Sequence, residues 1–137
     1  MLNEHQITFR VRYPECDGMG VVHHSNYFQY LEMGRVELLR ASGISYAQLE
    51  MEGILFAVAK VECKYKAPAR FDDELTLTTR VVRRTHVRID HAYTLRRGPT
   101  VIAEAVTTIA CVDRQGQLRE IPGELPGGMG DAGNAAR

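Results

Sequence analysis

Apolar and polar residues alternate along most of this chain, and the alternation predicts strands. Every second side chain is apolar between residues 7 and 13, the period of a half-buried strand. The period returns in residues 57–65, 75–81, 87–95 and 100–113, which turn-length segments separate. Strands joined by such short connections pair antiparallel, so the pattern predicts one antiparallel sheet of about five strands. In the second of these strands, one face is expected to carry Ala57, Ala59, Val61, Cys63 and Tyr65.

A helical period occurs between about residues 25 and 41, and Gly43 is placed to end that helix. Gly34 lies inside it and would let a sheet approach closely. Residues 45–52 add a short helical turn at most. One long helix against one sheet predicts an α+β fold in which the helix lies in the concave face of a curved sheet. The free edges and the outer face of such a sheet favour dimerisation.

Composition narrows the class of protein. The 137 residues suit one domain, and 45% are apolar and 25% charged, an ordinary globular balance. Seventeen basic and seventeen acidic residues cancel, so the net charge gives no reason to expect nucleic acid or an anionic membrane as partner. We expect the domain to span residues 1–122 and the glycine-rich residues 123–137 to form a disordered tail.

The sequence also indicates a compartment. No stretch is long and apolar enough to span a membrane, and the N-terminus has no apolar region of signal-peptide type. Three cysteines lie far apart with no CxxC pair, so neither a disulfide framework nor a zinc site is indicated. We therefore expect a reduced, cytoplasmic protein.

The unusual segment is residues 13–27, YPECDGMGVVHHSNY, where Asp17 lies in a glycine-bounded turn directly before the long helix. The first turn of a helix has backbone N–H groups without partners and a partial positive charge, which can stabilise an oxyanion. An ester or thioester carbonyl could thus meet N–H donors on one side and the Asp17 carboxylate on the other. Asp17 could act as nucleophile or general base. Spacing alone also allows the opposite interpretation, a turn residue or helix cap.

The run DGMGVVHHSNYF resembles the D-x-x-G-x-V-x-(Y/H)-x-N-Y signature of the 4-hydroxybenzoyl-CoA thioesterase family, including its YbgC-like acyl-CoA thioesterases. The resemblance covers about residues 5–122. It implies a hotdog fold and hydrolysis of an acyl-CoA substrate to free acid and CoA, without metal or redox cofactor, in a homodimer or homotetramer. It also implies that Asp17 is catalytic and that the backbone N–H of His24 polarises the thioester carbonyl.

Further candidates lie around this turn. Besides its backbone, the His24 side chain could assist the leaving thiolate. Asn26 could instead hold the turn by bonding to backbone, and Tyr27 could belong to the helix core. A thiol nucleophile at Cys16 and a metal site built from Cys16, Asp17, His23 and His24 are weaker alternatives, because the side chains need not share a face and the ligand spacing is irregular. The substrate-binding residues assigned here are Gly20, Val21, Val22, Asn26 and Tyr27.

A basic cluster of Arg83, Arg84 and Arg88 could bind the phosphates of CoA, or could simply be a solvated hairpin end. The same cluster could dock an acyl carrier protein, which makes an acyl-carrier-protein thioesterase one alternative function. A non-catalytic module that binds acyl-CoA is another. The acyl group is not identified by the sequence; its expected contacts suggest only an apolar chain or ring and comprise Phe28, Leu31, Leu55, Phe56 and Val58.

Overall fold

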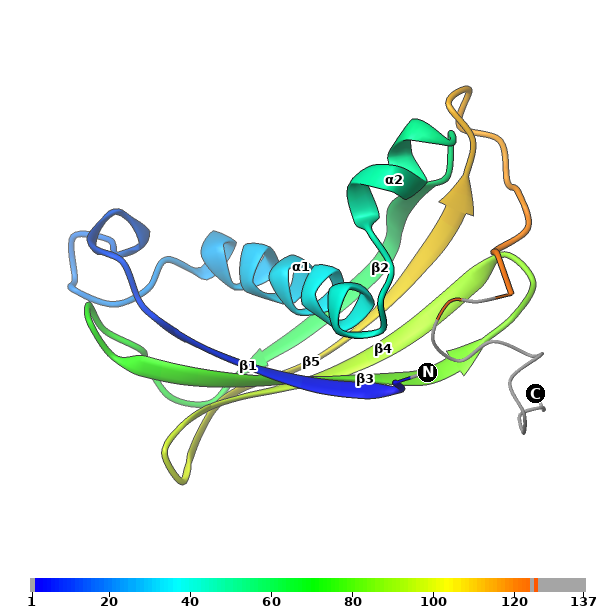
Figure 1. Cartoon of the computed structure of the whole chain (residues 1–137). Coiled ribbons are helices and arrows are strands. Elements are labelled where there is room, and N and C mark those ends of the chain that lie inside the picture. Colours follow the sequence, from blue (N-terminus) through cyan, green and yellow to red (C-terminus); the bar gives the residue numbers. More distant parts are fainter. Residues whose placement is uncertain (1, 124, 126–137) are drawn as a thin grey trace.

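The computed structural model describes residues 2–123 and 125. One sheet curves around one long helix, which lies across its concave face (Figure 1). The predicted α+β architecture is confirmed. In chain order the elements are β1 (Glu4–Arg10), the 3₁₀ turn η1 (Tyr13–Glu15), α1 (His24–Ala41), α2 (Tyr46–Met51), β2 (Leu55–Tyr65), β3 (Glu74–Arg84), β4 (Arg88–Arg97) and β5 (Thr100–Val112).

The five strands are antiparallel throughout and lie in the order β1-β3-β4-β5-β2. Their inward faces follow the predicted alternation. On β3, Leu75 and Leu77 are fully buried, and on β4 the buried residues are Ile89, His91, Tyr93 and Leu95. The outermost strands β1 and β2 each have one edge unpaired within the described chain.

Two strand predictions need correction. The first strand ends at Arg10 rather than at Tyr13, because the chain turns there into the 3₁₀ segment with Pro14 in its first turn. In β2, the pairing with β5 is interrupted by a bulge between Val58 and Lys60. A bulge inserts one extra residue and so reverses the faces beyond it. Val61 and Cys63 pack against the main core, whereas Ala57 and Ala59 are exposed.

Helix α1 begins at His24, one residue before the predicted start, and ends at Ala41 as predicted. Gly43 adopts φ +83°, the left-handed conformation that follows a helix end. Gly34 meets β3 directly: a Cβ built there would overlap the Thr79 hydroxyl oxygen and come within 2.8 Å of a Leu77 methyl carbon. The close approach predicted from Gly34 is therefore present.

The core has two parts. The larger lies under the first half of α1, around Tyr30, Leu75 and Ile102. The smaller lies under α2 and includes Leu49, Cys111 and Leu125. Leu125 is fully buried, so the chain contributes to the core beyond residue 122. The rest of the predicted tail, residues 124 and 126–137, lies outside the described residues. In the described part of the chain no helix has the length and apolar character needed to cross a bilayer.

Candidate active site at the start of helix α1

The loop between β1 and α1 is a narrow hairpin. Cys16 and Val22 form a bridge, the N–H of Asp17 donates to the carbonyl of Val21 over 2.9 Å, and Gly20 returns its N–H to the carbonyl of Asp17 over 3.0 Å. Gly20 has φ +80°, a conformation that glycine adopts without strain. The loop therefore holds the backbone of Asp17 in one conformation, within the segment that leads into α1.

The Asp17 carboxylate is ordered by the same loop. Its Oδ1 accepts the N–H of Met19 over 2.8 Å and that of Val21 over 3.5 Å. Asp113 shows the same pattern in the turn after β5, where its Oδ1 accepts the N–H groups of Gln115 and Gln117. The hydrogen bonds alone therefore describe a common turn. The difference is that Asp17 precedes a long helix.

His23, and not Asp17, caps that helix. Its Nδ1 accepts the N–H of Ser25 over 3.2 Å, and its carbonyl accepts the N–H of Asn26 over 2.9 Å. The N–H of His24 has no acceptor within the described residues, so it is free to donate to a ligand. The His24 ring is exposed and stacks on His23 with ring centroids 4.2 Å apart.

Glu15 fastens this loop to the helix, and sequence reasoning missed it. The residue is 8% exposed, and its carboxylate accepts hydrogen bonds from the Tyr30 hydroxyl at 2.7 Å, the Arg12 backbone N–H at 2.8 Å and the Arg12 Nε–H at 2.9 Å. Burial raises its pKa, but the hydrogen bonds from Arg12 and Tyr30 outweigh this and leave the pKa below its usual 4.5. In the sequence, Glu15 was marked only by the preceding Pro14, since a proline followed by a glutamate is typical of a first helical turn.

The Glu15 carbonyl adds two further ties. It accepts the His23 N–H and the Asn26 side-chain amide, both over 2.9 Å. Asn26 therefore holds the loop by donating to its backbone, as one of the two predictions for this residue had it; the other was substrate binding. The other predicted contact residues have structural places as well: Val22 is buried, Val21 bridges to Arg70, and Tyr27 lies in the core.

The alternative chemistries gain nothing from this geometry. Cys16 is half-buried and packs against the main core cluster, while Asp17 lies in the loop. Within residues 2–123 and 125 no three His, Cys, Asp or Glu side chains gather as metal ligands would.

The structure does not bring Arg83, Arg84 and Arg88 to Asp17. Val21 bridges to Arg70 just before β3, whereas the arginines lie at and beyond the far end of that strand (Figure 1). Eleven strand residues span about 33 Å. Arg84 is also engaged elsewhere, since its guanidinium donates to the carbonyls of Ile121, Pro122 and Leu125.

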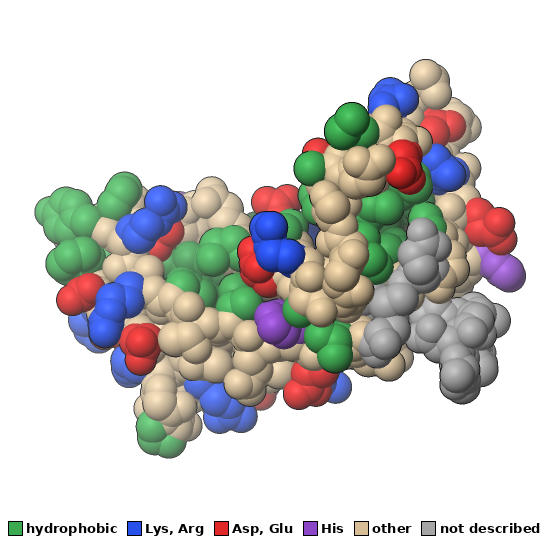
Figure 2. Space-filling model, viewed as in Figure 1, with side chains coloured by type: hydrophobic (Ala, Val, Ile, Leu, Met, Phe, Trp, Pro, Cys, Tyr) green, Lys and Arg blue, Asp and Glu red, His purple; other side chains and the backbone are tan. Residues whose placement is uncertain are grey.

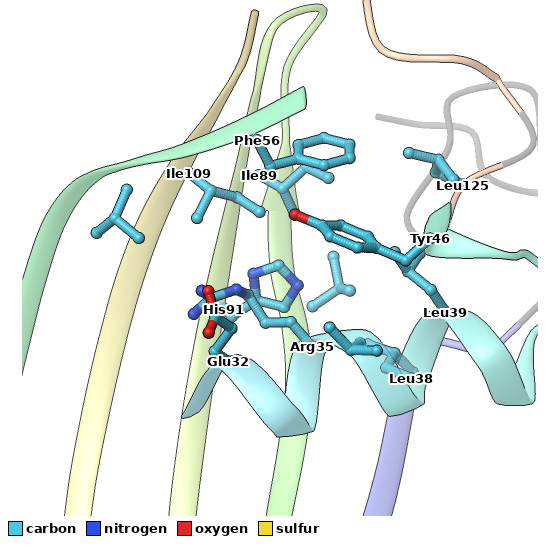
Figure 3. A pocket seen from close by; sticks show the side chains of 13 residues that line it. Glu32, Arg35, Leu38, Leu39, Tyr46, Phe56, Ile89, His91, Ile109 and Leu125 are labelled. Atoms are coloured by element: carbon cyan, nitrogen blue, oxygen red, sulfur yellow. The ribbon is translucent and has the colours of Figure 1, made fainter. Parts of the chain in front are cut away.

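A separate cavity opens beneath the second half of α1, lined by residues of α1, α2, β2, β3, β4 and β5 (Figure 3). Of the residues expected to meet an acyl group, Phe56 and Val58 line it, whereas Leu31 belongs to the core and Phe28 is exposed. Figure 2 shows apolar side chains gathered in the hollow over the helix, between the η1 loop and α2.

Residues 11–127 match the family model described as the thioesterase-like superfamily. The chain belongs to this superfamily. Acyl-CoA thioester hydrolase YbgC of Escherichia coli O6:H1 is 33% identical over 118 residues, which cover 85% of this chain and 86% of that protein. The crystal structure of a probable thioesterase from Bartonella henselae superposes with a TM-score of 0.83 at 31% identity, covering 87% of this chain and 99% of that one.

A third relative has another carrier in its name. The chloroplastic acyl-acyl carrier protein thioesterase ATL3 of Arabidopsis thaliana is 27% identical over 123 residues, which cover 88% of this chain and 65% of that protein. Superfamily membership confirms the predicted hotdog fold, and it confirms that the chain is a thioester hydrolase.

Proposed function

We propose that this thioesterase hydrolyses an acyl-CoA to the free acid and CoA at the start of α1. Two observations on the same loop carry the proposal: the Asp17 carboxylate is ordered by the N–H groups of Met19 and Val21, and the His24 N–H at the helix start has no acceptor in the described chain. The acyl-CoA part rests on the activity named for the E. coli relative.

The chemistry follows from charge. The carbonyl oxygen of the thioester accepts the N–H of His24, at the positive end of the helix, and negative charge developing on that oxygen is stabilised there. Asp17 then either takes a proton from a water that attacks the carbonyl carbon, or attacks that carbon itself to form an anhydride that water cleaves. In both routes the carbon–sulfur bond breaks, and the CoA thiolate leaves and takes up a proton.

We place this reaction in a homodimer or homotetramer in the cytoplasm. The free edge of β2 and the exposed Val58 and Phe28 beside the helix are features that a second copy of the chain would cover. Arg83 and Arg88 lie at the far end of β3, a strand about 33 Å long, and could reach CoA phosphates across such a subunit boundary. The three free cysteines fit a reducing compartment.

One alternative keeps the site and changes the carrier. The Arabidopsis relative acts, by its name, on acyl-acyl carrier protein. An acidic carrier would need a basic docking surface, and Arg83 and Arg88 are exposed. Comparing the release of thiol from one acyl group on CoA and on acyl carrier protein decides between the two.

The test of the site uses two aspartates in equivalent turns. Asp17→Asn should lower turnover of acyl-CoAs by about 10²- to 10⁴-fold while the protein stays folded. Asp113→Asn changes the same kind of turn far from the helix start, so it should hydrolyse acyl-CoAs at the wild-type rate. Equal rates for Asp17→Asn and wild type would refute the assignment. No hydrolysis of any thioester by the wild type would instead favour a non-catalytic acyl-CoA-binding module.

A further inference from the structure

The cavity beneath α1 has an apolar side and a polar side (Figure 3). It measures about 50 Å³, which is room for a few water-sized groups. Phe56, Ile109 and Leu39 form much of the apolar side, and the ring of His91 lies opposite, beside Arg35. The hydroxyl of Tyr46 points into the same space. An apolar ligand with one polar end would match this distribution.

His91 is a buried polar residue that lines the cavity and that the proposed thioesterase mechanism does not use. The residue is 5% exposed, and its Nδ1 has no hydrogen-bond partner among the described residues. Burial and the nearby Arg35 cation lower its pKa to about 3, so the ring is neutral at physiological pH. One N–H group of Arg35 donates to the Tyr93 hydroxyl over 3.0 Å. A neutral imidazole has one donor and one acceptor nitrogen, so a ligand hydroxyl can satisfy it in either sense.

Helix α1 and strand β2 both extend from the candidate active site toward this cavity. Strand β2 runs alongside α1 in the opposite direction: Tyr65 contacts Tyr27 near the helix start, while Phe56 and Val58 face the second half of the helix. The bulge after Val58 turns these two side chains toward the cavity. Phe28, exposed on the same helix, lies one turn before Glu32, which lines the cavity. An acyl chain could follow this side of the helix from one place to the other.

The distance along helix α1 from His24 to the cavity sets the length of the acyl group. Arg35 follows His24 by eleven residues, or about 16 Å along the helix axis. An extended chain advances about 1.2 Å per bond, since one residue of three backbone bonds spans ~3.3–3.6 Å. A carbonyl at the His24 N–H and a polar group at His91 are therefore separated by about thirteen bonds.

We propose that the cavity binds the far end of a medium-length acyl group that carries a terminal hydroxyl, with His91 as its hydrogen-bond partner. This specificity rests on the proposed thioesterase function, because the reach is measured from the His24 N–H. The cavity lining holds one anion, Glu32, and one cation, Arg35, while His91 carries no positive charge. The lining therefore has no excess positive charge that would favour a terminal carboxylate over a hydroxyl. His91 is here a specificity-determining residue and takes no part in the bond-breaking step.

The experiment compares dodecanoyl-CoA with ω-hydroxydodecanoyl-CoA, using the ratio of their kcat/KM values. Wild type should favour the hydroxylated substrate, and His91→Phe should lower that preference by about tenfold, the value of one hydrogen bond. His91→Gln keeps a donor and an acceptor and should retain part of it. Thr79→Val is the matched control: Thr79 also has a buried oxygen without a partner but does not line the cavity, so this variant should keep the wild-type ratio.

A second measurement separates the pocket from the chemistry. Calorimetry with the free acids should show tighter binding of ω-hydroxydodecanoic acid than of dodecanoic acid to wild type, and loss of that difference in His91→Phe. An unchanged ratio in His91→Phe, a preference for the ω-carboxy analogue, or equal binding of the two acids would each overturn the proposal. Absent turnover of every thioester, with the binding difference intact, would reject the thioesterase function and leave the hydroxyl site standing.

Discussion

Gly34→Ala should destabilise the protein, although alanine is the better helix former. The new Cβ would overlap the Thr79 hydroxyl oxygen and lie 2.8 Å from a Leu77 methyl carbon, against an ordinary contact of about 3.5–4.0 Å. Thr79 is 1% exposed, β-branched and part of β3, so it cannot rotate away cheaply. Helix α1 would have to withdraw from the sheet by about 1 Å. Overpacking of this kind costs ~1–3 kcal/mol, whereas replacing glycine by alanine in a helix returns about 1 kcal/mol.

The net expectation is a loss of about 1 kcal/mol, because the middle of the steric range exceeds the propensity gain by that amount. Urea unfolding followed by circular dichroism measures it, and the melting temperature should fall by about 4 °C per kcal/mol. Thr79→Ala in the same chain removes the overlapping oxygen and should recover part of the loss. Thr79→Val keeps an atom there and should not. This account of the contact would be refuted if Gly34→Ala were as stable as wild type. It would also be refuted if Thr79→Ala and Thr79→Val both restored the stability lost in Gly34→Ala.

Two further changes test the loop that holds Asp17. Glu15→Gln should cost about 2 kcal/mol at pH 7, the value of hydrogen bonds to a buried charged group. Because its folded pKa lies below the unfolded 4.5, the stability due to this carboxylate is complete above that pH and is lost as the pH falls through the folded value. Urea unfolding from pH 7 to pH 3 should show the free energies of unfolding of wild type and Glu15→Gln converging in acid. A difference that stays constant with pH would contradict the lowered pKa of Glu15. His23→Ala should cost about 1 kcal/mol by removing the helix cap, and thermal unfolding should show no such loss in His24→Ala.

Much of this fold could be predicted because period and burial coincide. Helix α1, the short α2 and the inward faces of β3 and β4 follow from patterns that depend only on which side of an element meets the core. Strand β2 shows the limit. Its composition alternates without interruption, yet the bulge after Val58 reverses the faces. A bulge is set by pairing with β5, which no local count of apolar residues contains.

The candidate site divides in the same way. Asp17 and its turn could be found because glycine spacing and a following helix are local features. Glu15 could not, since its importance comes from Tyr30, fifteen residues later, and from the backbone it supports. The arginines were grouped because they are neighbours in sequence, but the guanidinium of Arg84 is occupied by backbone carbonyls near residue 125. The direction of a side chain at the end of a strand depends on the segment that packs against it, and neighbouring positions in the sequence do not reveal that segment.

The contact made by Arg84 has a consequence for how enzymes of this shape could diversify. Its guanidinium secures the carbonyl of Leu125, and the Leu125 side chain forms one wall of the cavity under α1. That wall is thus supplied by a segment outside the sheet, attached by a few hydrogen bonds. Substitutions there could enlarge or shorten the space offered to a substrate while leaving the sheet, the helix and the Asp17 loop untouched. Because Leu125 is also fully buried in the smaller core, each such change would also cost stability, so substrate range and folding are linked at this wall.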